Sequence, residues 1–255
     1  MRIEYAGLTH VGMKRNHNED SFLLVPEANV FIVADGMGGH SSGEIASRIA
    51  VEEIAEFYRM TERDEEATWP FKMDKARNYD ENRMSVAVKL ANSRIVEAAT
   101  VDPKLKGMGT TCVAMAFRGT TAYVGHVGDS RVYRLRNGEL SQVTEDHSLL
   151  NDYIKAKKLT PEEIEAFPHK NVIVRALGMK ETVEVDVLKD EPKDGDVYIM
   201  CSDGLSGMIP DEQIAEIVST CADDLNVATE RLIEAANAAG GTDNVTVVIN
   251  RLSSS

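Results

Sequence analysis

The sequence has 255 residues, of which 43% are hydrophobic, enough for one large domain with a substantial core. Its 42 acidic residues outnumber 28 Lys and Arg, and the formal net charge of −14 argues against binding to nucleic acid or to an anionic membrane. No apolar run approaches the length of a membrane span, and the first residues lack the charged-then-apolar pattern of a signal sequence. We therefore expect a cytoplasmic protein.

The first part of the chain predicts a small group of strands followed by a helix. The strands are expected at 2–10, 22–25 and 30–33. If the second and third form a hairpin, Glu19, Asp20 and Asp35 fall at one edge of a sheet. The glycines after Asp35 favour a sharp turn with positive φ and allow a ligand to approach the backbone. Ser41 then begins a helix, with Glu44 placed to complete its capping box.

The rest of the chain changes repeatedly between helical and strand periodicity. Further helices are expected at 82–100, 146–159, 210–220 and 223–239, with another capped start at Thr160 and Pro161. Further strands are expected at 110–117, 121–127, 131–135, 139–143, 172–176, 182–188, 196–201 and 245–249. The stretch from about 145 to 171 interrupts the strands and is a candidate flap, and residues 253–255 are expected to fray. Strands in hairpin order predict an α+β fold with two antiparallel sheets packed face to face and helices outside.

Four aspartates share one setting in this pattern. Asp35, Asp129, Asp203 and Asp243 each stand at a glycine-flanked end of an apolar strand. One such residue is most simply an Asp-Gly turn, but four carboxylates at one sheet edge repel one another unless a cation neutralises them. Ligation by oxygen alone favours Mg²⁺ or Mn²⁺ over zinc or copper. A divalent-metal site is the favoured interpretation, and scattered turn acids are the alternative.

Six segments of the chain resemble the motifs of the metal-dependent protein phosphatases (PPM family, type 2C serine/threonine phosphatases), particularly the bacterial members. They are Arg15-x-x-x-Glu19-Asp20, Asp35-Gly36-Met37-Gly38-Gly39-His40, Gly107-Met108-Gly109-Thr110-Thr111, Gly128-Asp129-Ser130-Arg131, Cys201-Ser202-Asp203-Gly204-Leu205 and Gly241-Thr242-Asp243-Asn244. The resemblance runs from about Gly7 to Val248. It implies an αββα four-layer sandwich, formed by one domain over 1–252, with a two- or three-metal site in a cleft at one end.

The resemblance also implies a role for each acid. Asp35 corresponds to the ligand that bridges two metals, and the carbonyl group of Gly36 adds a contact. Asp203 and Asp243 correspond to ligands of the first metal. Asp20, with Glu19 as a helper, would hold waters bound to the second. Asp129 corresponds to the residue that binds a third, weaker ion together with Asp203.

The reaction implied is direct hydrolysis, in which a metal-bridging hydroxide attacks phosphorus in line and no covalent intermediate forms. Arg15 would bind the substrate phosphate through its guanidinium fork. Eukaryotic members usually carry a His directly after the Asp-Gly pair as a proposed general acid, and Met37 stands there in this chain. His40 is a candidate for contact with substrate or leaving group, and the alternative is a helix-entry residue facing solvent.

The favoured function is therefore a Mn²⁺- or Mg²⁺-dependent phosphoserine/phosphothreonine protein phosphatase, expected to be a monomer. Its substrates would be phosphoproteins, and the resemblance implies that it opposes a bacterial-type serine/threonine kinase. A catalytically weak phosphatase fold used as a binding module is a second interpretation, which the complete set of acids disfavours. A metal-dependent nuclease could also use an acidic cluster, but a net charge of −14 disfavours it. The sequence leaves open the natural substrate, the metal used, the general acid and the role of the flap.

Overall fold

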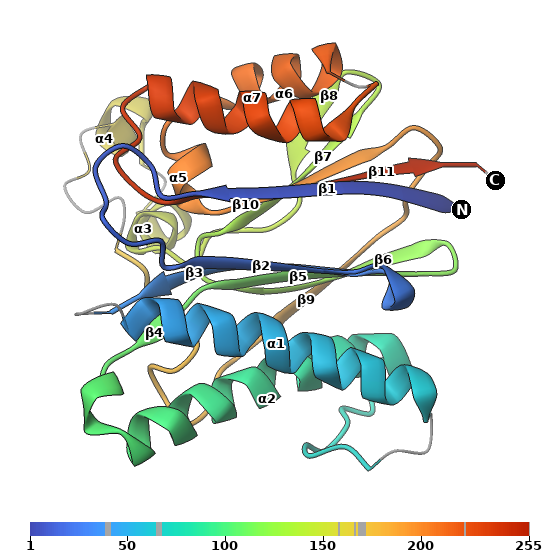
Figure 1. The fold of residues 1–255 in the computed structure, drawn as a ribbon, viewed down its shortest axis with the longest axis vertical. Helices are drawn as coiled ribbons and strands as arrows, with labels where there is room; N and C mark the ends of the chain where they lie inside the picture. The colour runs from blue at the N-terminus through green and yellow to red at the C-terminus, as the bar shows by residue number, and fades with distance from the viewer. Residues whose placement is uncertain are drawn as a thin grey trace.

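The computed structural model describes residues 1–38, 42–64, 68–157, 159–165, 167, 172–221 and 223–254. Two antiparallel β-sheets pack face to face, and helices cover both outer faces (Figure 1). The expected fold class, an α+β four-layer sandwich, is confirmed. None of the helices in the described ranges is both long and apolar enough to cross a membrane.

The first sheet has the strand order β1-β11-β10-β7-β8. Its strands are β1 (Arg2–His10), β11 (Val245–Ser253), β10 (Val197–Cys201), β7 (Arg131–Arg136) and β8 (Glu139–Gln142). The first and last strands of the chain pair along their whole length, from Arg2 opposite Ser253 to His10 opposite Val245. The expectation that Ser253 frays is therefore wrong, because its backbone is part of this ladder.

The second sheet has the order β2-β3-β5-β6-β9, with the short strand β4 attached to β3. Its strands are β2 (Asp20–Val25), β3 (Val30–Met37), β4 (Gly109–Thr110), β5 (Cys112–Arg118), β6 (Thr121–Val127) and β9 (Asp186–Asp190). The three-residue 3₁₀ turn η1 (Pro26–Ala28) connects β2 to β3. The hairpin on which the expected meeting of Glu19, Asp20 and Asp35 depends is therefore present.

Two long helices lie on the second sheet and two shorter ones on the first (Figure 1). They are α1 (Ser42–Arg63) and α2 (Tyr79–Val101) on one side, and α6 (Asp211–Thr220) and α7 (Leu225–Ala238) on the other; η3 (Pro103–Leu105) follows α2. Each interface between layers is filled by its own group of buried apolar residues. Between the sheets, Phe117 packs edge-on against both Phe31 and Tyr198. Burial of these three interfaces is the main driving force for the fold.

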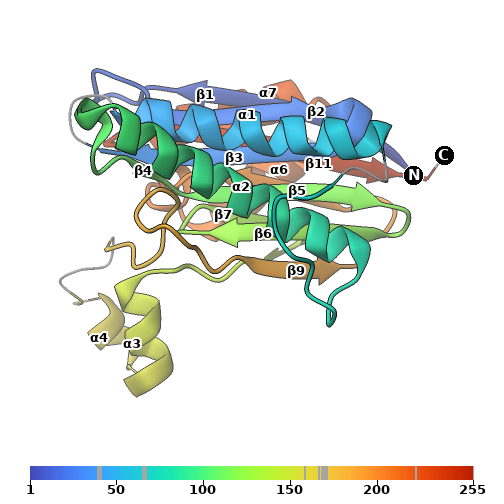
Figure 2. The same ribbon diagram turned by 90° about the horizontal axis from the view of Figure 1, so that it is seen from below.

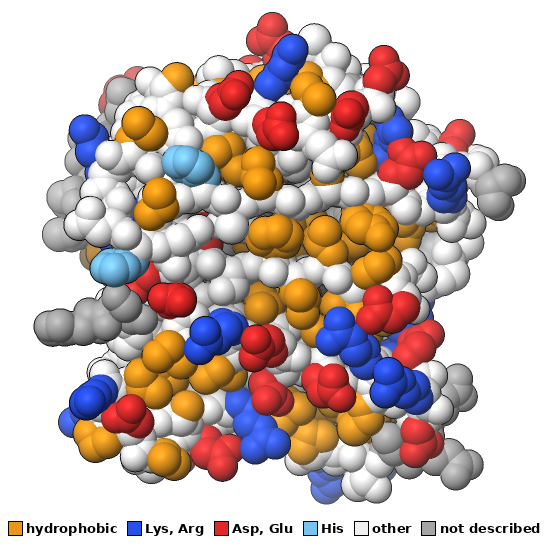
Figure 3. Space-filling model, in the orientation of Figure 1, with side chains coloured by type: hydrophobic (Ala, Val, Ile, Leu, Met, Phe, Trp, Pro, Cys, Tyr) orange, Lys and Arg blue, Asp and Glu red, His pale blue; other side chains and the backbone are white. Residues whose placement is uncertain are grey.

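The surface on the side of β1 and β2 shows how the charge is distributed (Figure 3). Acidic and basic side chains alternate over α1, and apolar side chains occupy the seam between the two edge strands. On this face, Lys and Arg do not gather into a single basic patch. On this face, the acidic side chains are therefore interspersed with basic ones.

Three of the element predictions differ from the structure. Helix α2 begins at Tyr79, before the expected start at 82, because Asn78 and Glu81 form a reciprocal capping box with two bonds of 2.9 Å. The strand expected at 172–176 is wrong: in the described part of that stretch only Ile173 forms a bridge, to Ser148. The next strand, expected at 182–188, is shifted to Asp186–Asp190.

The flap segment contains two short helices that project beyond the four layers (Figure 2). They are α3 (Leu149–Lys157) and α4 (Pro161–Glu165). The expected cap of α4 is confirmed by reciprocal bonds between Thr160 and Glu163 of 2.8 and 3.3 Å. At the root of the flap, Arg175 is paired with Asp186 of β9 at 2.7 Å, so the segment is tied to the sheet.

Candidate metal centre

Asp20 and Asp35 lie directly opposite each other across the β2–β3 hairpin, on one face of the sheet. The sequence predicted that Asp35 ends its strand. In the structure the strand continues beyond it, because Gly36 and Met37 of β3 pair with β4. Gly36 does not adopt positive φ. It is required for close approach instead, since a Cβ there would overlap the carbonyl oxygen of Glu19.

Two threonines where β4 ends and β5 begins, Thr110 and Thr111, hold the Asp35 backbone. Thr111 accepts a hydrogen bond from the Asp35 amide at 3.0 Å and donates its own amide to the Asp35 carbonyl at 2.8 Å. The Thr110 hydroxyl donates to the same carbonyl at 2.9 Å. The Thr111 hydroxyl also bonds Ser130, beside Asp129, at 2.7 Å. These bonds fix the backbone and leave the Asp35 carboxylate to face its neighbours.

Asp20 is held from the opposite sheet. The hydroxyls of Ser202 and Thr246 donate to its Oδ2 atom at 2.8 and 2.7 Å. Burial raises the pKa of Asp20 to about 7, although these two hydroxyls lower it, and the charges of Asp203 and Asp243 add to the rise. Asp20 is therefore a buried acid, and its position is fixed by both sheets.

Asp203 and Asp243 come from two turns that pack against each other. Asp203 begins the short helix α5 (Asp203–Ser206) after β10, and Asp243 lies just before β11. A side chain at Gly204 would overlap the carbonyl oxygen of Asn244, so the turns meet backbone to backbone. Burial and then Asp243 raise the pKa of Asp203, while a hydrogen bond with Asp35 lowers it.

Asp129 lies in the turn between β6 and β7 and is only 8% exposed. Its Oδ1 atom is buried and has no hydrogen-bond partner. Burial raises the pKa of Asp129 to about 7, with Asp203 and Asp146 contributing. The pKa of Asp35 is raised well above its usual range by burial and then by Asp20, Asp203, Asp129 and Asp243. The structure therefore brings together all the aspartates that the sequence singled out.

The remaining predicted residues have other partners. Arg15 donates to Asp243 Oδ2 at 2.7 Å, and the second carboxylate oxygen of Asp243 accepts from the Asn244 amide. Glu19 Oε1 accepts from the Gly43 amide at 3.2 Å and so caps the start of α1. His40 lies outside the described residues.

Sequence reasoning gave no role to Asn244, which organises the loop that carries Arg15. The side-chain amide nitrogen of Asn244 donates to the backbone carbonyls of Val11 and His17, both at 2.9 Å. Its side-chain oxygen accepts a hydrogen bond from the backbone amide of Glu19 at 2.8 Å. The sequence did contain a signal for Asn244, since it is the last residue of the motif Gly241-Thr242-Asp243-Asn244. Thr246 had no such signal, because it stands in an ordinary strand and meets Asp20 only in the folded chain.

A cavity of about 320 Å³ lies between these turns and the flap. Its lining includes the carboxylates Asp129, Asp146, Asp203 and Asp243 together with Arg131. Arg131 and Asp146 form a bidentate ion pair, in which the guanidinium donates to both carboxylate oxygens. The cavity is therefore acidic, and three of the candidate metal ligands, Asp129, Asp203 and Asp243, line it.

The donor set fits a hard divalent cation, because it contains only oxygen and includes one buried carboxylate oxygen without a partner. The carboxylates do not by themselves form a finished coordination sphere: no three acidic, His or Cys side chains of the described chain are grouped so as to hold an ion. Hydroxyls bind Asp20 and Arg15 binds Asp243. The charge of the cluster is thus offset partly by these partners and partly by raised pKa values.

The comparisons with known proteins point to one class. A family model described as Protein phosphatase 2C matches residues 7–239. The chain is 37% identical over 247 residues to the serine/threonine protein phosphatase PstP of Mycobacterium tuberculosis, covering 97% of this chain and 44% of that protein. It is 36% identical over 252 residues to protein phosphatase PhpP of Streptococcus pneumoniae, covering 97% and 96% of the two chains. The chain thus spans less than half of PstP.

Solved structures agree. A crystal structure of PstP has a TM-score of 0.86 at 36% identity and covers 99% of both chains. The PstP catalytic domain in complex with two manganese ions has a TM-score of 0.81 at 35% identity, with the same coverage. Fold and motifs therefore place the chain among the metal-dependent serine/threonine protein phosphatases. It belongs to the protein phosphatase 2C family, which confirms the resemblance to bacterial members.

Proposed function

We propose that this chain hydrolyses phosphoserine and phosphothreonine esters in proteins, using Mn²⁺ or Mg²⁺. The observation that carries the proposal is the electrostatic coupling of aspartates from five segments, three of which line one acidic cavity, in a chain of the 2C family. The relative PstP has been solved with two manganese ions, which supports manganese. A bacterial-type serine/threonine kinase as the opposing enzyme, action as a monomer in the cytoplasm, and a single domain over 1–252 belong to the same proposal.

Asp35 would bind both core ions, Asp203 and Asp243 one of them, and Asp20 the other through water. The carbonyl of Gly36 would add a contact. Asp129 would hold a third, weaker ion with Asp203; its unpartnered Oδ1 atom supports that assignment. The hydrogen bond of Glu19 to the start of α1 favours a supporting role for Glu19, because that oxygen is already engaged.

When bound, the ions would offset the charge of the phosphoryl oxygens and activate water for in-line attack without a covalent intermediate. The guanidinium of Arg15 would bind two phosphoryl oxygens, and it must exchange Asp243 for the phosphate to do so. Met37 has no proton to donate, so protonation of the leaving oxygen falls to another group. His40 remains the candidate from the sequence.

The test is hydrolysis of p-nitrophenyl phosphate and of a phosphothreonine peptide by the purified chain with Mn²⁺, with and without chelator. Asp35→Asn and Asp203→Asn should lower turnover of both by more than about 100-fold, since loss of outer supporting groups alone costs 10–100-fold. Asp223→Asn is the matched control, because Asp223 is exposed and distant in sequence from every motif. Full activity in Asp203→Asn would refute the metal assignment, and tight phosphopeptide binding without turnover would favour a binding module.

A further inference from the structure

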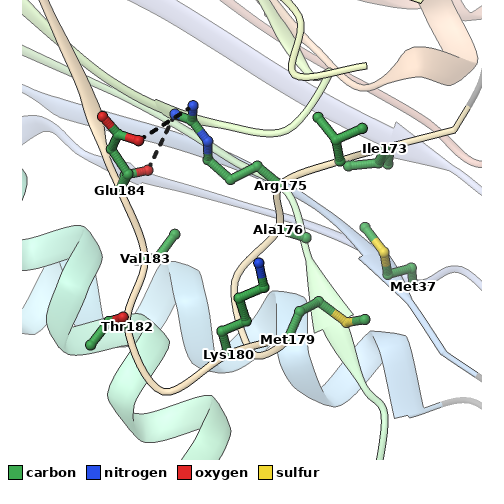
Figure 4. Close-up of a pocket in the computed structure, with 10 residues that line it drawn as sticks. Met37, Ile173, Arg175, Ala176, Met179, Lys180, Thr182, Val183 and Glu184 are labelled. Atoms are coloured by element: carbon green, nitrogen blue, oxygen red, sulfur yellow. Dashed lines mark hydrogen bonds and ion pairs between the residues drawn. The ribbon is translucent and has the colours of Figure 1, made fainter. Parts of the chain in front are cut away.

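A second cavity, of about 380 Å³, lies beside Met37 at the root of the flap (Figure 4). One wall is the chain returning from the flap, and the other is the segment that leads into β9. The apolar side chains that line this groove are those of Met37, Ile173, Val174, Ala176, Met179 and Val183. None of these residues takes part in the proposed chemistry.

The groove shares its backbone support with the metal centre. Met37 stands two residues after Asp35 in the same strand and pairs with Gly109. Leu177, between the lining residues Ala176 and Met179, bridges to Thr110, whose hydroxyl holds the Asp35 carbonyl. An extended peptide advances about 3.3 Å per residue. Two to four residues of an extended peptide therefore span about 7–13 Å, so a substrate that runs from the metal centre toward Met37 would place a side chain over the groove.

The groove presents apolar surface to solvent. Val174 and Met179 are 45% and 56% exposed, and the adjoining Val172 is 43% exposed. Clustered exposed apolar side chains on a highly charged protein are typical of a binding surface. They would be covered by an apolar side chain of a bound peptide.

One basic side chain in the groove has no ionic partner among the described residues. Arg175 is paired with Glu184 and Asp186 at 3.7 and 2.7 Å. Lys180 has no such pair, and its amine points up between Ala176 and Val183 (Figure 4). In a chain with a net charge of −14, an unpaired lysine beside an apolar groove complements an acidic residue of a ligand.

We propose that this groove selects the substrate sequence: it takes an apolar side chain two to four positions from the phosphorylated residue, and Lys180 faces an acidic neighbour. This inference rests on the proposed function and narrows its substrates to phosphosites with apolar and acidic flanking residues. The flap thereby contributes to specificity through its root, next to the metal centre.

The experiment uses the full chain with phosphothreonine peptides in which one Leu is moved through positions −4 to +4, each compared with its Ser version. At one position Leu should raise kcat/KM about 10-fold, the scale on which an apolar pocket discriminates. The double variant Val174→Ser, Met179→Ser should lose this preference. Met73→Ser is the control, since Met73 is 55% exposed and lies in the loop at the opposite end of the sandwich.

Lys180→Glu tests the charge: a preference for Glu over Lys in the peptide should reverse, by roughly 3-fold each way for an exposed pair. Lys72→Glu is its control. Turnover of p-nitrophenyl phosphate, which has no flanking residues, should stay unchanged in every variant. Peptide affinity measured by fluorescence anisotropy tests the groove even if the chain does not turn the peptide over. Failure of the proposed function can therefore be distinguished from failure of the groove proposal. Indifference of the wild type to Leu, or retention of both preferences in the variants, would overturn the proposal.

Discussion

Replacing Asp129 by Asn should stabilise the ion-free chain and weaken the enzyme. Asp129 is 8% exposed, and its Oδ1 atom has no partner. Burial raises its pKa from 3.8 to about 7, and Asp203 and Asp146 contribute to the rise. A buried carboxylate with a raised pKa opposes folding when it is ionised, and the neutral amide of Asn removes that charge without changing the shape.

The sign and size follow from linkage. Because the folded pKa exceeds the unfolded one, ionisation of Asp129 destabilises the folded chain progressively from pH 4 to pH 7 and fully above that. About three pKa units at 1.36 kcal/mol each give an upper bound of about 4 kcal/mol at pH 8. The buried Asn amide lacks partners and offsets about 1–3 kcal/mol of this. A net stabilisation of about 1–3 kcal/mol is therefore expected at pH 8, whereas at pH 4 only the amide penalty of about 1–3 kcal/mol remains and the variant should be the less stable chain.

The measurement is urea unfolding of wild type and Asp129→Asn in chelator at pH 5 and pH 8, with Asp223→Asn as the exposed control. Added Mn²⁺ should invert the order at pH 8, because ions that bind only the folded carboxylates stabilise the wild type more. Turnover at saturating Mn²⁺ should fall in the variant. A difference between wild type and variant that does not change with pH would refute the reasoning.

Three further outcomes are expected. Thr246→Val removes a 2.7 Å hydroxyl bond to Asp20 and should weaken Mn²⁺ binding about 10–100-fold by calorimetry; an unchanged affinity would show that this hydroxyl is dispensable. Arg15→Lys keeps the charge but loses the fork, so steady-state kinetics on a phosphopeptide should show KM raised several-fold and kcat less affected. Gly36→Ala forces a Cβ onto carbonyl oxygens and should destabilise the chain by about 1–3 kcal/mol in urea unfolding; wild-type stability would contradict that packing.

The gathering of acids was predictable because it depends on local pattern. Apolar runs on both sides of a short turn indicate the β2–β3 hairpin, and its register places Asp20 opposite Asp35. The turns that carry Asp129, Asp203 and Asp243 can be identified in the sequence because each contains a glycine within two residues of the aspartate. Element order then determines which turns meet at one end of the two sheets.

The support of these acids was not predictable in the same way. Thr246 and Ser202 lie 226 and 182 residues from Asp20 along the chain, and nothing in a single strand marks which hydroxyl will face a carboxylate in the other sheet. The strand prediction for 172–176 was wrong for a related reason. Its apolar residues are typical of a strand, but several of them line the groove at the root of the flap. Tertiary position, which periodicity does not encode, decided both.

The chain has a single tryptophan, and its location makes it a selective spectroscopic probe. Trp69 packs edge-on against Phe57 of α1 and at a tilt against Tyr79, the first residue of α2. Phe57 is 14 residues along α1 from Gly43, which touches the metal centre, and this corresponds to about 21 Å of helix. The fluorescence emission of Trp69 should therefore follow the unfolding of the α1–α2 layer. An ion that binds at Asp35 is too distant to change the surroundings of Trp69.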